Sequence, residues 1–276
     1  MSGKLYVVGT PIGNLGDMSP RAVETLEKVD FIAAEDTRVT IKLLNHFGFK
    51  KTMISYHEHN KASRNEVISE RLLAGETCAL VTDAGMPAIS DPGEDLVRYC
   101  HEKGIEVESV PGPSALITAL AISGMPSGRF SFEGFLSVNK TGRIEHLESL
   151  KNDRHTLIFY EAPHKLLSTL HDMFTVFGDR KVALVKELTK VHENAEITTL
   201  ALAVEKYSET APKGEFVIIL EGADEQKAEE YTVEKATEIA KKFMADGMSP
   251  TAAAKEAATI SGIRKSDIYR SIIDTK

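Results

Sequence analysis

The sequence predicts an α/β protein made of two α/β domains and a small helical extension at the C-terminal end. Short apolar runs alternate with segments of helical periodicity through the first 222 residues, and this alternation is typical of parallel βαβ units. The chain has 276 residues, which exceeds the common size of a single domain. We therefore expect an N-terminal domain over 1–112, a second domain over 113–222, and a linker with helices over 223–276.

In the first domain, apolar runs predict strands and amphipathic segments predict helices. Pro20 follows Ser19, and proline fits the first turn of a helix. Gly48, Gly75 and Gly104 follow the later helices, where glycine commonly ends a helix. The expected strands are 4–8, 31–34, 52–56, 78–82 and 105–110, and the expected helices are 20–28, 39–47, 61–74 and 94–103.

The second domain repeats the alternation, and the Pro-Gly-Pro run at 111–113 marks the boundary because it interrupts the periodicity. Strands near 188–199 follow one another with no helix between them, so we expect a mixed sheet. The expected strands are 130–135, 156–161, 181–187, 196–199 and 216–220, and the expected helices are 166–177 and 200–207.

After Gly222 the composition shifts to the charged run 224–230, which predicts a solvated linker. Helical pieces follow at 233–244, 251–261 and 265–273. Their spacing resembles a small helix-turn-helix, and a bundle that docks on another surface explains the pattern equally well.

The charge balance excludes a global footprint for nucleic acid. The net charge is −8 and the pI is about 5.7, so any RNA contact must be local. Between Arg38 and Arg71 the chain has seven Lys or Arg and three Glu. We interpret this stretch as a positive patch for RNA, although an ordinary charged helix surface explains it nearly as well.

No apolar run reaches the roughly 18 residues of a membrane span, and the first residues show no signal pattern. The interpretation is a soluble, cytoplasmic protein. Cys78 and Cys100 stand in apolar or helical context without metal-ligand spacing, which predicts buried free thiols.

Three loops rich in Gly and Pro follow strands of the first domain, at 9–16, 83–93 and 111–115. The glycines of the first loop lack the spacing of a dinucleotide fingerprint and the Gly-Lys-Ser/Thr ending of a triphosphate loop. Small residues let a ligand lie close to backbone at the carboxyl edge of a sheet. With loops 159–164 and 211–216 from the second half, they predict a ligand cleft between the halves.

Some side chains in these loops fit either ligand binding or a purely structural role. Asp83, Ser90 and Asp91 are candidate ligand-binding groups after a buried strand. Helix capping alone could account for Ser90 and Asp91, and Ser114 could likewise cap the helix that follows it.

Six motifs in co-linear order resemble those of the tetrapyrrole-methylase-like, or class III, methyltransferases. They cover about residues 5–222. The motifs are Val-Gly-Thr-Pro-Ile-Gly-Asn-Leu-Gly at 8–16, Ala-Glu-Asp-Thr-Arg at 34–38, Val-Thr-Asp-Ala-Gly-Met-Pro-Ala-Ile-Ser-Asp-Pro-Gly at 81–93, Pro-Gly-Pro-Ser-Ala at 111–115, Phe-Tyr-Glu-Ala-Pro-His at 159–164 and Pro-Lys-Gly-Glu-Phe at 212–216.

The resemblance implies the tetrapyrrole methylase-like fold, a homodimer, and S-adenosylmethionine folded into the cleft with no metal. Within the family the chain is most similar to enzymes that methylate the ribose 2′-hydroxyl of a cytidine in 16S rRNA, at the decoding centre of the small ribosomal subunit. Tetrapyrrole relatives typically have Gly-Asp-Pro at the position where this chain has Gly-Met-Pro, residues 85–87. The acidic group of this chain stands at Asp83 instead. The implied cofactor residues are Pro11, Asp83, Gly85, Met86, Ile89, Ser114, Ala115, Tyr160, Glu161, Ala162, Leu188, Pro212, Lys213 and Gly214.

Glu35, Asp36 and Arg38 are the candidate catalytic residues on the substrate side. Two carboxylates and an arginine at a strand end could orient a ribose or anchor a phosphate, whereas an ion-paired helix start is the alternative. Lys186 and Glu187 are weaker candidates for moving a proton.

Two other functions stay open. A methyltransferase of this fold could act on a tetrapyrrole or a protein, and a nucleic-acid-binding regulator could use the C-terminal helices.

Overall fold

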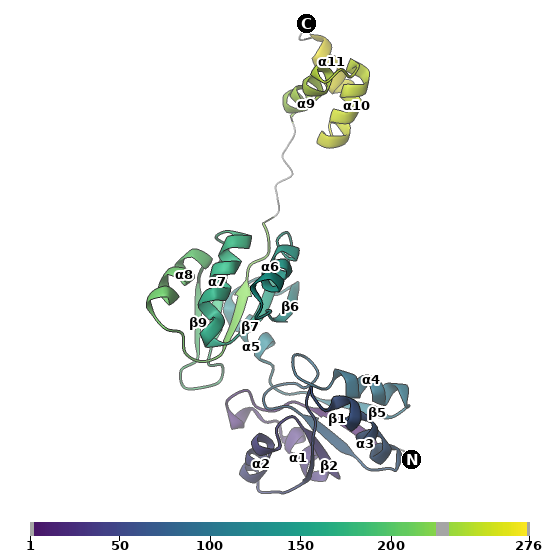
Figure 1. Cartoon of the computed structure of the whole chain (residues 1–276), viewed down its shortest axis with the longest axis vertical. Helices are drawn as coiled ribbons and strands as arrows, with labels where there is room; N and C mark the ends of the chain where they lie inside the picture. Colours follow the sequence, from purple (N-terminus) through teal and green to yellow (C-terminus); the bar gives the residue numbers. More distant parts are fainter. Residues whose placement is uncertain (1–2, 225–231, 275–276) are drawn as a thin grey trace. The chain divides into compact units, whose positions relative to one another are not determined.

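The computed structural model describes residues 3–224 and 232–274 (Figure 1). Residues 1–222 form one unit and residues 223–276 a second. The predicted boundary at 112 falls inside the first unit, between the last strand of one sheet and the first helix after it. Most of the charged run 224–230, predicted to be a linker, lies outside the described residues.

The first sheet contains five parallel strands in the order β3-β2-β4-β1-β5. Since parallel strands end at the same edge, β1 carries its loop between the loops of β4 and β5. The three Gly- and Pro-rich loops predicted from sequence are thus immediate neighbours. The strands are β1 Lys4–Val8, β2 Phe31–Ala34, β3 Thr52–Ser55, β4 Cys78–Val81 and β5 Glu106–Val110.

Helices cover both faces of this sheet, because neighbouring residues of one strand point to opposite sides. Phe31 and Ala33 pack in a cluster with Ile68 of α3 and Leu96 of α4. Ile32 and Ala34 instead pack with residues of α1 and α2. The helices are α1 Pro20–Lys28, α2 Thr37–His46, α3 Lys61–Leu73 and α4 Glu94–Glu102, with the short 3₁₀ turn η1 Leu15–Asp17 before them.

The second sheet has the order β6-β7-β10-β8-β9. Its β6 and β7 are parallel and the other neighbouring pairs are antiparallel, so the predicted mixed sheet is confirmed. The strands are β6 Phe130–Phe135, β7 Thr156–Glu161, β8 Lys181–Lys186, β9 Asn194–Thr199 and β10 Phe216–Leu220, and the helices are α5 Ala115–Ser123, α6 Lys140–Ser149, α7 Pro163–Phe177 and α8 Leu200–Glu209.

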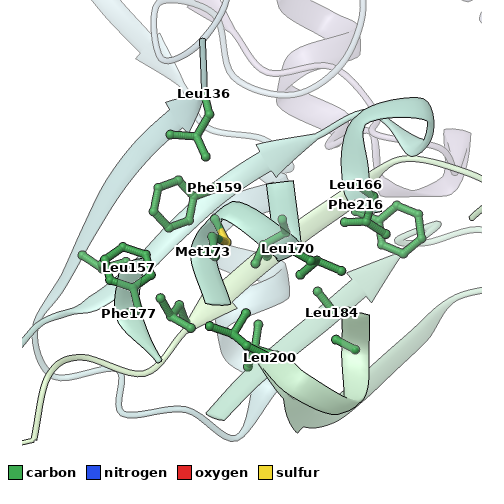
Figure 2. Close-up of a cluster of buried hydrophobic side chains, with 14 of the residues drawn as sticks. Leu136, Leu157, Phe159, Leu166, Leu170, Met173, Phe177, Leu184, Leu200 and Phe216 are labelled. Atoms are coloured by element: carbon green, nitrogen blue, oxygen red, sulfur yellow. The ribbon is translucent and has the colours of Figure 1, made fainter. Parts of the chain in front are cut away.

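Figure 2 shows the larger core of this half, where α7 packs on the sheet. Leu170 and Met173 of α7 point toward Phe159 of β7 and Leu184 of β8, and all four are buried. The opposite face is covered by α5, whose Leu116, Ala119 and Leu120 are buried there with residues of β7, β8 and β10. This places the N-terminal end of α5 next to the loops of the first sheet.

Helix α6 is absent from the sequence prediction. Only two of its residues, Ile144 and Leu147, are apolar, so its hydrophobic period is weak. Its buried side also carries Arg143, whose Nε lies 2.7 Å from Asp172 Oδ2 on α7. A buried ion pair therefore replaces part of the apolar stripe that sequence reasoning looks for.

In the described part of the C-terminal unit, three helices pack on one another: α9 Val233–Ala245, α10 Pro250–Ser261 and α11 Lys265–Asp274. Gly262 ends α10 in the left-handed conformation with φ 68°. The core is small and rich in alanine: Ala236, Ala240, Ala253, Ala254, Ala257, Ile268 and Ile272. The two sheets, their helices and this bundle confirm the predicted fold class.

Cys78 and Cys100 are buried and unbridged, as expected. Burial raises the pKa of the Cys100 thiol to about 11. Among the helices that the structure describes, none is long and apolar enough to cross a bilayer.

Candidate functional site

The loops after β1 and β5 cross with their backbones in contact. Gly9 N donates a hydrogen bond to Val110 O at 3.1 Å. A Cβ on Gly9 would lie 2.7 Å from Gly112 Cα and 2.7 Å from Met86 Sδ, and a Cβ on Gly112 would lie 2.8 Å from Gly9 Cα. Since real Cβ atoms do not approach this closely, the crossing requires glycine on both loops.

A two-bond backbone bridge joins the loop after β1 to the loop after β4. Thr10 N donates to Gly85 O at 2.9 Å, and Gly85 N donates to Thr10 O at 3.1 Å. The Thr10 hydroxyl adds a bond to Thr82 O at 3.0 Å. Gly85 has φ 86°, which favours glycine. The three loops are therefore fixed to one another before any ligand binds.

These loops form one side of a cavity, here called the interdomain cavity, whose other side comes from the second half of the chain. Its surface combines apolar side chains with a few carboxylates and one lysine. It is lined by Ile12, Ala84, Gly85, Met86, Ile89, Ser90, Asp91, Ser114, Ala115, Phe135, Tyr160, Glu161, Ala162, Glu187, Leu188, Lys190, Glu215, Phe216 and Val217.

Most residues predicted to bind the cofactor line this cavity, and the other five stand within three positions of a lining residue in the sequence. Those on the cavity are Gly85, Met86, Ile89, Ser114, Ala115, Tyr160, Glu161, Ala162 and Leu188. Pro11 precedes the lining residue Ile12, Asp83 precedes Ala84, and Pro212, Lys213 and Gly214 precede Glu215.

Tyr160 links β7 to the start of α5. Its hydroxyl accepts a hydrogen bond from Leu116 N at 3.0 Å and so caps the helix that Ser114 was expected to cap. The Ser114 side chain makes no capping bond within the described part of the chain. Phe132 and Phe135 pack edge-on against the Tyr160 ring, and burial raises the pKa of Tyr160 to about 12. Ser114 is left available to a ligand.

Glu161 is almost completely buried, and the fold satisfies its carboxylate. Oε1 accepts from Ala162 N at 3.0 Å and lies 3.2 Å from Lys165 Nζ, and Oε2 accepts from the Thr169 hydroxyl at 2.6 Å. These bonds fix the turn from β7 into α7. The Glu161 carboxylate thus holds the cavity wall in place.

The loop after β8 closes another side of the interdomain cavity with a strained backbone. Glu187 and Thr189 have φ of 52° and 64°, which is uncommon for side chains other than glycine. Glu187 Oε1 lies 3.2 Å from Lys190 Nζ. A Cβ on Gly214 would lie 2.5 Å from Glu187 Oε1, so glycine in the predicted 212–214 segment makes room for this carboxylate.

Glu35, Asp36 and Asp83 brace the loops after β2 and β4. Asp83 N donates to Glu35 Oε2 at 3.2 Å, and Asp36 N donates to Asp83 Oδ1 at 3.2 Å. Burial is the largest cause of the raised pKa of Glu35. The Glu35 side chain also lines a second cavity described below.

Asp36 and Arg38 have the geometry of the ion-paired helix start. Asp36 Oδ1 accepts from Arg38 N at 2.8 Å, and Arg38 Nη2 lies 2.7 Å from Asp36 Oδ2. The Arg38 hydrogen bonds hold the pKa of Asp36 down at about 2. Arg38 itself is 87% exposed, so its outer face can still meet an anion. The catalytic assignment of these residues stays a prediction.

The predicted positive patch is partly neutralised. Lys61 pairs with Glu58 and Asp95, each at 2.6 Å. Arg71 pairs with Glu76, and Lys51 Nζ donates to Val29 O at 2.7 Å. Arg38 is paired with Asp36, as described above. Lys42, Lys50 and Arg64 are the cations of this stretch whose side chains have neither an ion pair nor a hydrogen bond with other described residues.

A second cavity adjoins the first. We call it the acidic cavity because five of its lining residues are carboxylic acids. It is lined by Glu35, His57, Glu58, His59, Lys61, Ala88, Ile89, Ser90, Asp91, Pro92, Gly93, Glu94 and Asp95.

The side chains of Ser90 and Asp91 do not cap α4. The N-cap of that helix is Gly93, at φ 147°, and the hydrogen bonds of the described residues include none from either side chain. The capping explanation is therefore wrong, and the ligand-binding role of both residues stays a prediction.

Sequence reasoning missed several lining residues. Phe135 stands at the end of β6, where a bulge between Phe132 and Gly134 redirects the strand, and no motif signals this. Glu187 was only a weak candidate, and Lys190 and Glu215 were not singled out, although Glu215 lies inside the sixth motif. Across the described residues, no group of His, Cys, Asp or Glu is arranged to hold a metal ion.

Comparison with known proteins identifies the family. The model of the Tetrapyrrole (Corrin/Porphyrin) Methylases matches residues 4–203. This match covers more than half of the chain, so the chain belongs to that family and is a methyltransferase.

Relatives within the family are similar over nearly the whole chain. Ribosomal RNA small subunit methyltransferase I from Synechocystis sp. is 46% identical over 269 residues, covering 97% of this chain and 96% of its own. The protein of that name from Thermotoga maritima is 46% identical over 222 residues, covering 80% of this chain and 100% of its own. About a fifth of this chain therefore has no counterpart in the Thermotoga protein.

A solved structure shares the fold at low identity. Uroporphyrin-III C-methyl transferase from Thermus thermophilus, complexed with S-adenyl homocysteine, matches with a TM-score of 0.54 at 19% identity, covering 78% of this chain and 97% of that one. The likeness concerns the fold alone.

Replacing Gly9 by alanine should destabilise the protein by about 1–3 kcal/mol, because the added methyl overlaps the Gly112 backbone and Met86. The measurement is the midpoint of urea unfolding followed by circular dichroism. Gly128→Ala is the matched control, since a Cβ there meets open space. Equal midpoints for the two variants would show that the loop crossing is not a steric constraint.

Proposed function

We propose that this protein transfers the methyl group of S-adenosylmethionine to the ribose 2′-hydroxyl of a cytidine in 16S rRNA of the small ribosomal subunit. The observation that carries the proposal is 46% identity to a ribosomal RNA small subunit methyltransferase I over 97% of the chain. The interdomain cavity, in the position that the six motifs predict, supports it.

The residues of the interdomain cavity suit S-adenosylmethionine. Apolar surface for an adenosine comes from Met86, Ile89 and Leu188. A ligand can also lie close to the backbone of the crossing loops. The carboxylate of Glu187 faces the same cavity and would attract the cationic sulfonium and ammonium groups. The bound cofactor supplies a methyl group activated by positive charge on sulfur.

The main contribution of the chain is alignment. Holding the ribose hydroxyl in line with the methyl carbon and the sulfur can contribute several kcal/mol to the rate. The braced loops suit this task, because Thr10, Gly85 and Gly9 are tied by backbone bonds and contacts that leave little freedom. Glu35, Asp36 and Arg38, at the end of the neighbouring strand β2, would orient the substrate.

The RNA backbone needs positive charge outside the acidic cavity. Three cations of the predicted patch have no side-chain hydrogen bond or ion pair in the described structure, and we assign them to phosphate contacts: Lys42, Lys50 and Arg64. The exposed face of Arg38 adds to them. We expect the affinity for RNA to fall with added salt.

The protein is further proposed to act in the cytoplasm as a homodimer. The support for the homodimer is the resemblance to the tetrapyrrole-methylase-like methyltransferases, which implies one. Sedimentation equilibrium at micromolar concentration should give twice the mass of the chain, and a monomer would contradict this part of the proposal.

The alternatives have weaker support. The tetrapyrrole substrate rests on a likeness of fold at 19% identity. A regulator that works through α9–α11 needs those helices, yet the alignment with the Thermotoga relative leaves about a fifth of this chain unmatched.

The direct test is transfer of labelled methyl from S-adenosylmethionine to isolated small ribosomal subunits and to naked 16S rRNA. We expect label in a 2′-O-methylcytidine after nuclease digestion. Calorimetric binding of the cofactor is measured on the same preparation. Cofactor binding without label in either RNA would contradict the substrate assignment.

Arg38→Ala should weaken RNA binding by about threefold to tenfold and cofactor binding by less. The reason is that its exposed charge lies outside the interdomain cavity. Filter binding at fixed salt measures the RNA affinity, and calorimetry measures the cofactor affinity. Lys28→Ala removes an exposed charge on α1 as a control. A parallel loss of both affinities in Arg38→Ala would assign Arg38 to a structural role.

A further inference from the structure

The interdomain cavity and the acidic cavity meet at one short segment. Ile89, Ser90 and Asp91 line both of them, and no other described residue does. The two cavities therefore adjoin at this segment. Of the three side chains, Asp91 alone carries a charge.

Asp91 differs from the neighbouring carboxylates because its oxygens have no hydrogen-bond or ion-pair partner in the described structure. Glu35 accepts from Asp83 N, and Asp83 accepts from Asp36 N. Glu35 lines the acidic cavity only, and Asp83 lines neither cavity. Asp91 is thus the one carboxylate that is both unengaged and placed at the junction.

The acidic cavity fits an uncharged hydrogen-bond donor. Its carboxylates would repel a phosphate, while its one cation, Lys61, is already paired with Glu58 and Asp95. His57 Nδ1 is buried on its wall without a partner among the described residues, and buried polar atoms normally find one. Ribose hydroxyls and the amino group of a cytosine are ligands of the right chemistry.

We propose that the acidic cavity receives the target ribose and that Asp91 is a catalytic residue that accepts the proton of its 2′-hydroxyl. This inference rests on the proposed methyl transfer. The bond between O2′ and the methyl carbon forms as the bond between carbon and sulfur breaks, with its electron pair left on sulfur. The O2′ proton passes to the Asp91 carboxylate and then to water.

The surroundings of Asp91 make it a stronger base than an ordinary aspartate. Burial, followed by the charges of Glu35 and Asp83, raises the pKa of Asp91 to about 6. The base form is the deprotonated one, so the rate of the chemical step should rise with pH through about 6 and level off above it. The other ionisable groups facing the two cavities are His57, Glu58, His59, Lys61, Glu94, Asp95, Tyr160, Glu161, Glu187, Lys190 and Glu215.

The experiment compares the wild-type protein with Asp91→Asn in single-turnover methyl transfer to small ribosomal subunits from pH 5 to 9. Loss of a general base should lower the rate by about 10²–10⁴-fold and remove the inflection near pH 6. Calorimetric affinity for S-adenosylmethionine and filter-binding affinity for the RNA should each stay within about threefold, because Asp91→Asn keeps the shape of the side chain.

Glu35→Gln gives an independent readout. It removes one of the charges that raise the pKa of Asp91, so the inflection should move to lower pH, whatever the change in the maximal rate. Glu102→Gln, which removes an exposed charge on α4 away from both cavities, should leave rate and profile unchanged.

Three results would overturn the assignment. They are an unchanged rate in Asp91→Asn, an inflection that persists in it, or a loss of cofactor affinity that matches the loss of rate, which would make Asp91 a cofactor ligand. If the wild-type protein itself transfers no methyl to RNA, the proposed function fails, and that result is separate from these three.

Discussion

The crossing of two glycines, Gly9 and Gly112, is the contact on which the site depends. It exists because β1 lies between β4 and β5 in the sheet, which brings three loops to one edge with no room for side chains between them. The Thr10–Gly85 bridge then ties the third loop to the first. A ligand at this edge meets backbone that the sheet already holds in place. Binding therefore loses no free energy to the ordering of these loops.

Carboxylates around this edge divide into two kinds. Glu35, Asp83 and Glu161 are held by backbone or side-chain donors and fix the loops that carry them. Asp91 is held by none of the described residues and lies where the two cavities meet. Because unpaired partly buried charge is costly, this placement supports the role that we propose for Asp91.

Much of this architecture follows from the sequence, because the strands are short apolar runs bounded by Gly and Pro. The strands 4–8, 31–34, 130–135, 156–161 and 216–220 have the predicted bounds. The features that the sequence does not predict have physical causes. Helix α6 buries Arg143 in place of an apolar side chain. The hydroxyl of Tyr160 on β7 caps α5, and Lys61 of α3 pairs with Asp95 of α4. Such pairings depend on tertiary contacts that one chain segment does not encode.

The central claim is that the three joined loops hold S-adenosylmethionine in the interdomain cavity with its methyl group directed toward the junction at Asp91. A crystal structure of the protein with S-adenosylmethionine tests this directly. The account predicts density for the cofactor against Gly85, Met86 and Ser114, with the methyl carbon facing Asp91 and the acidic cavity. Cofactor density outside the interdomain cavity, or a methyl group turned away from Asp91, would contradict it.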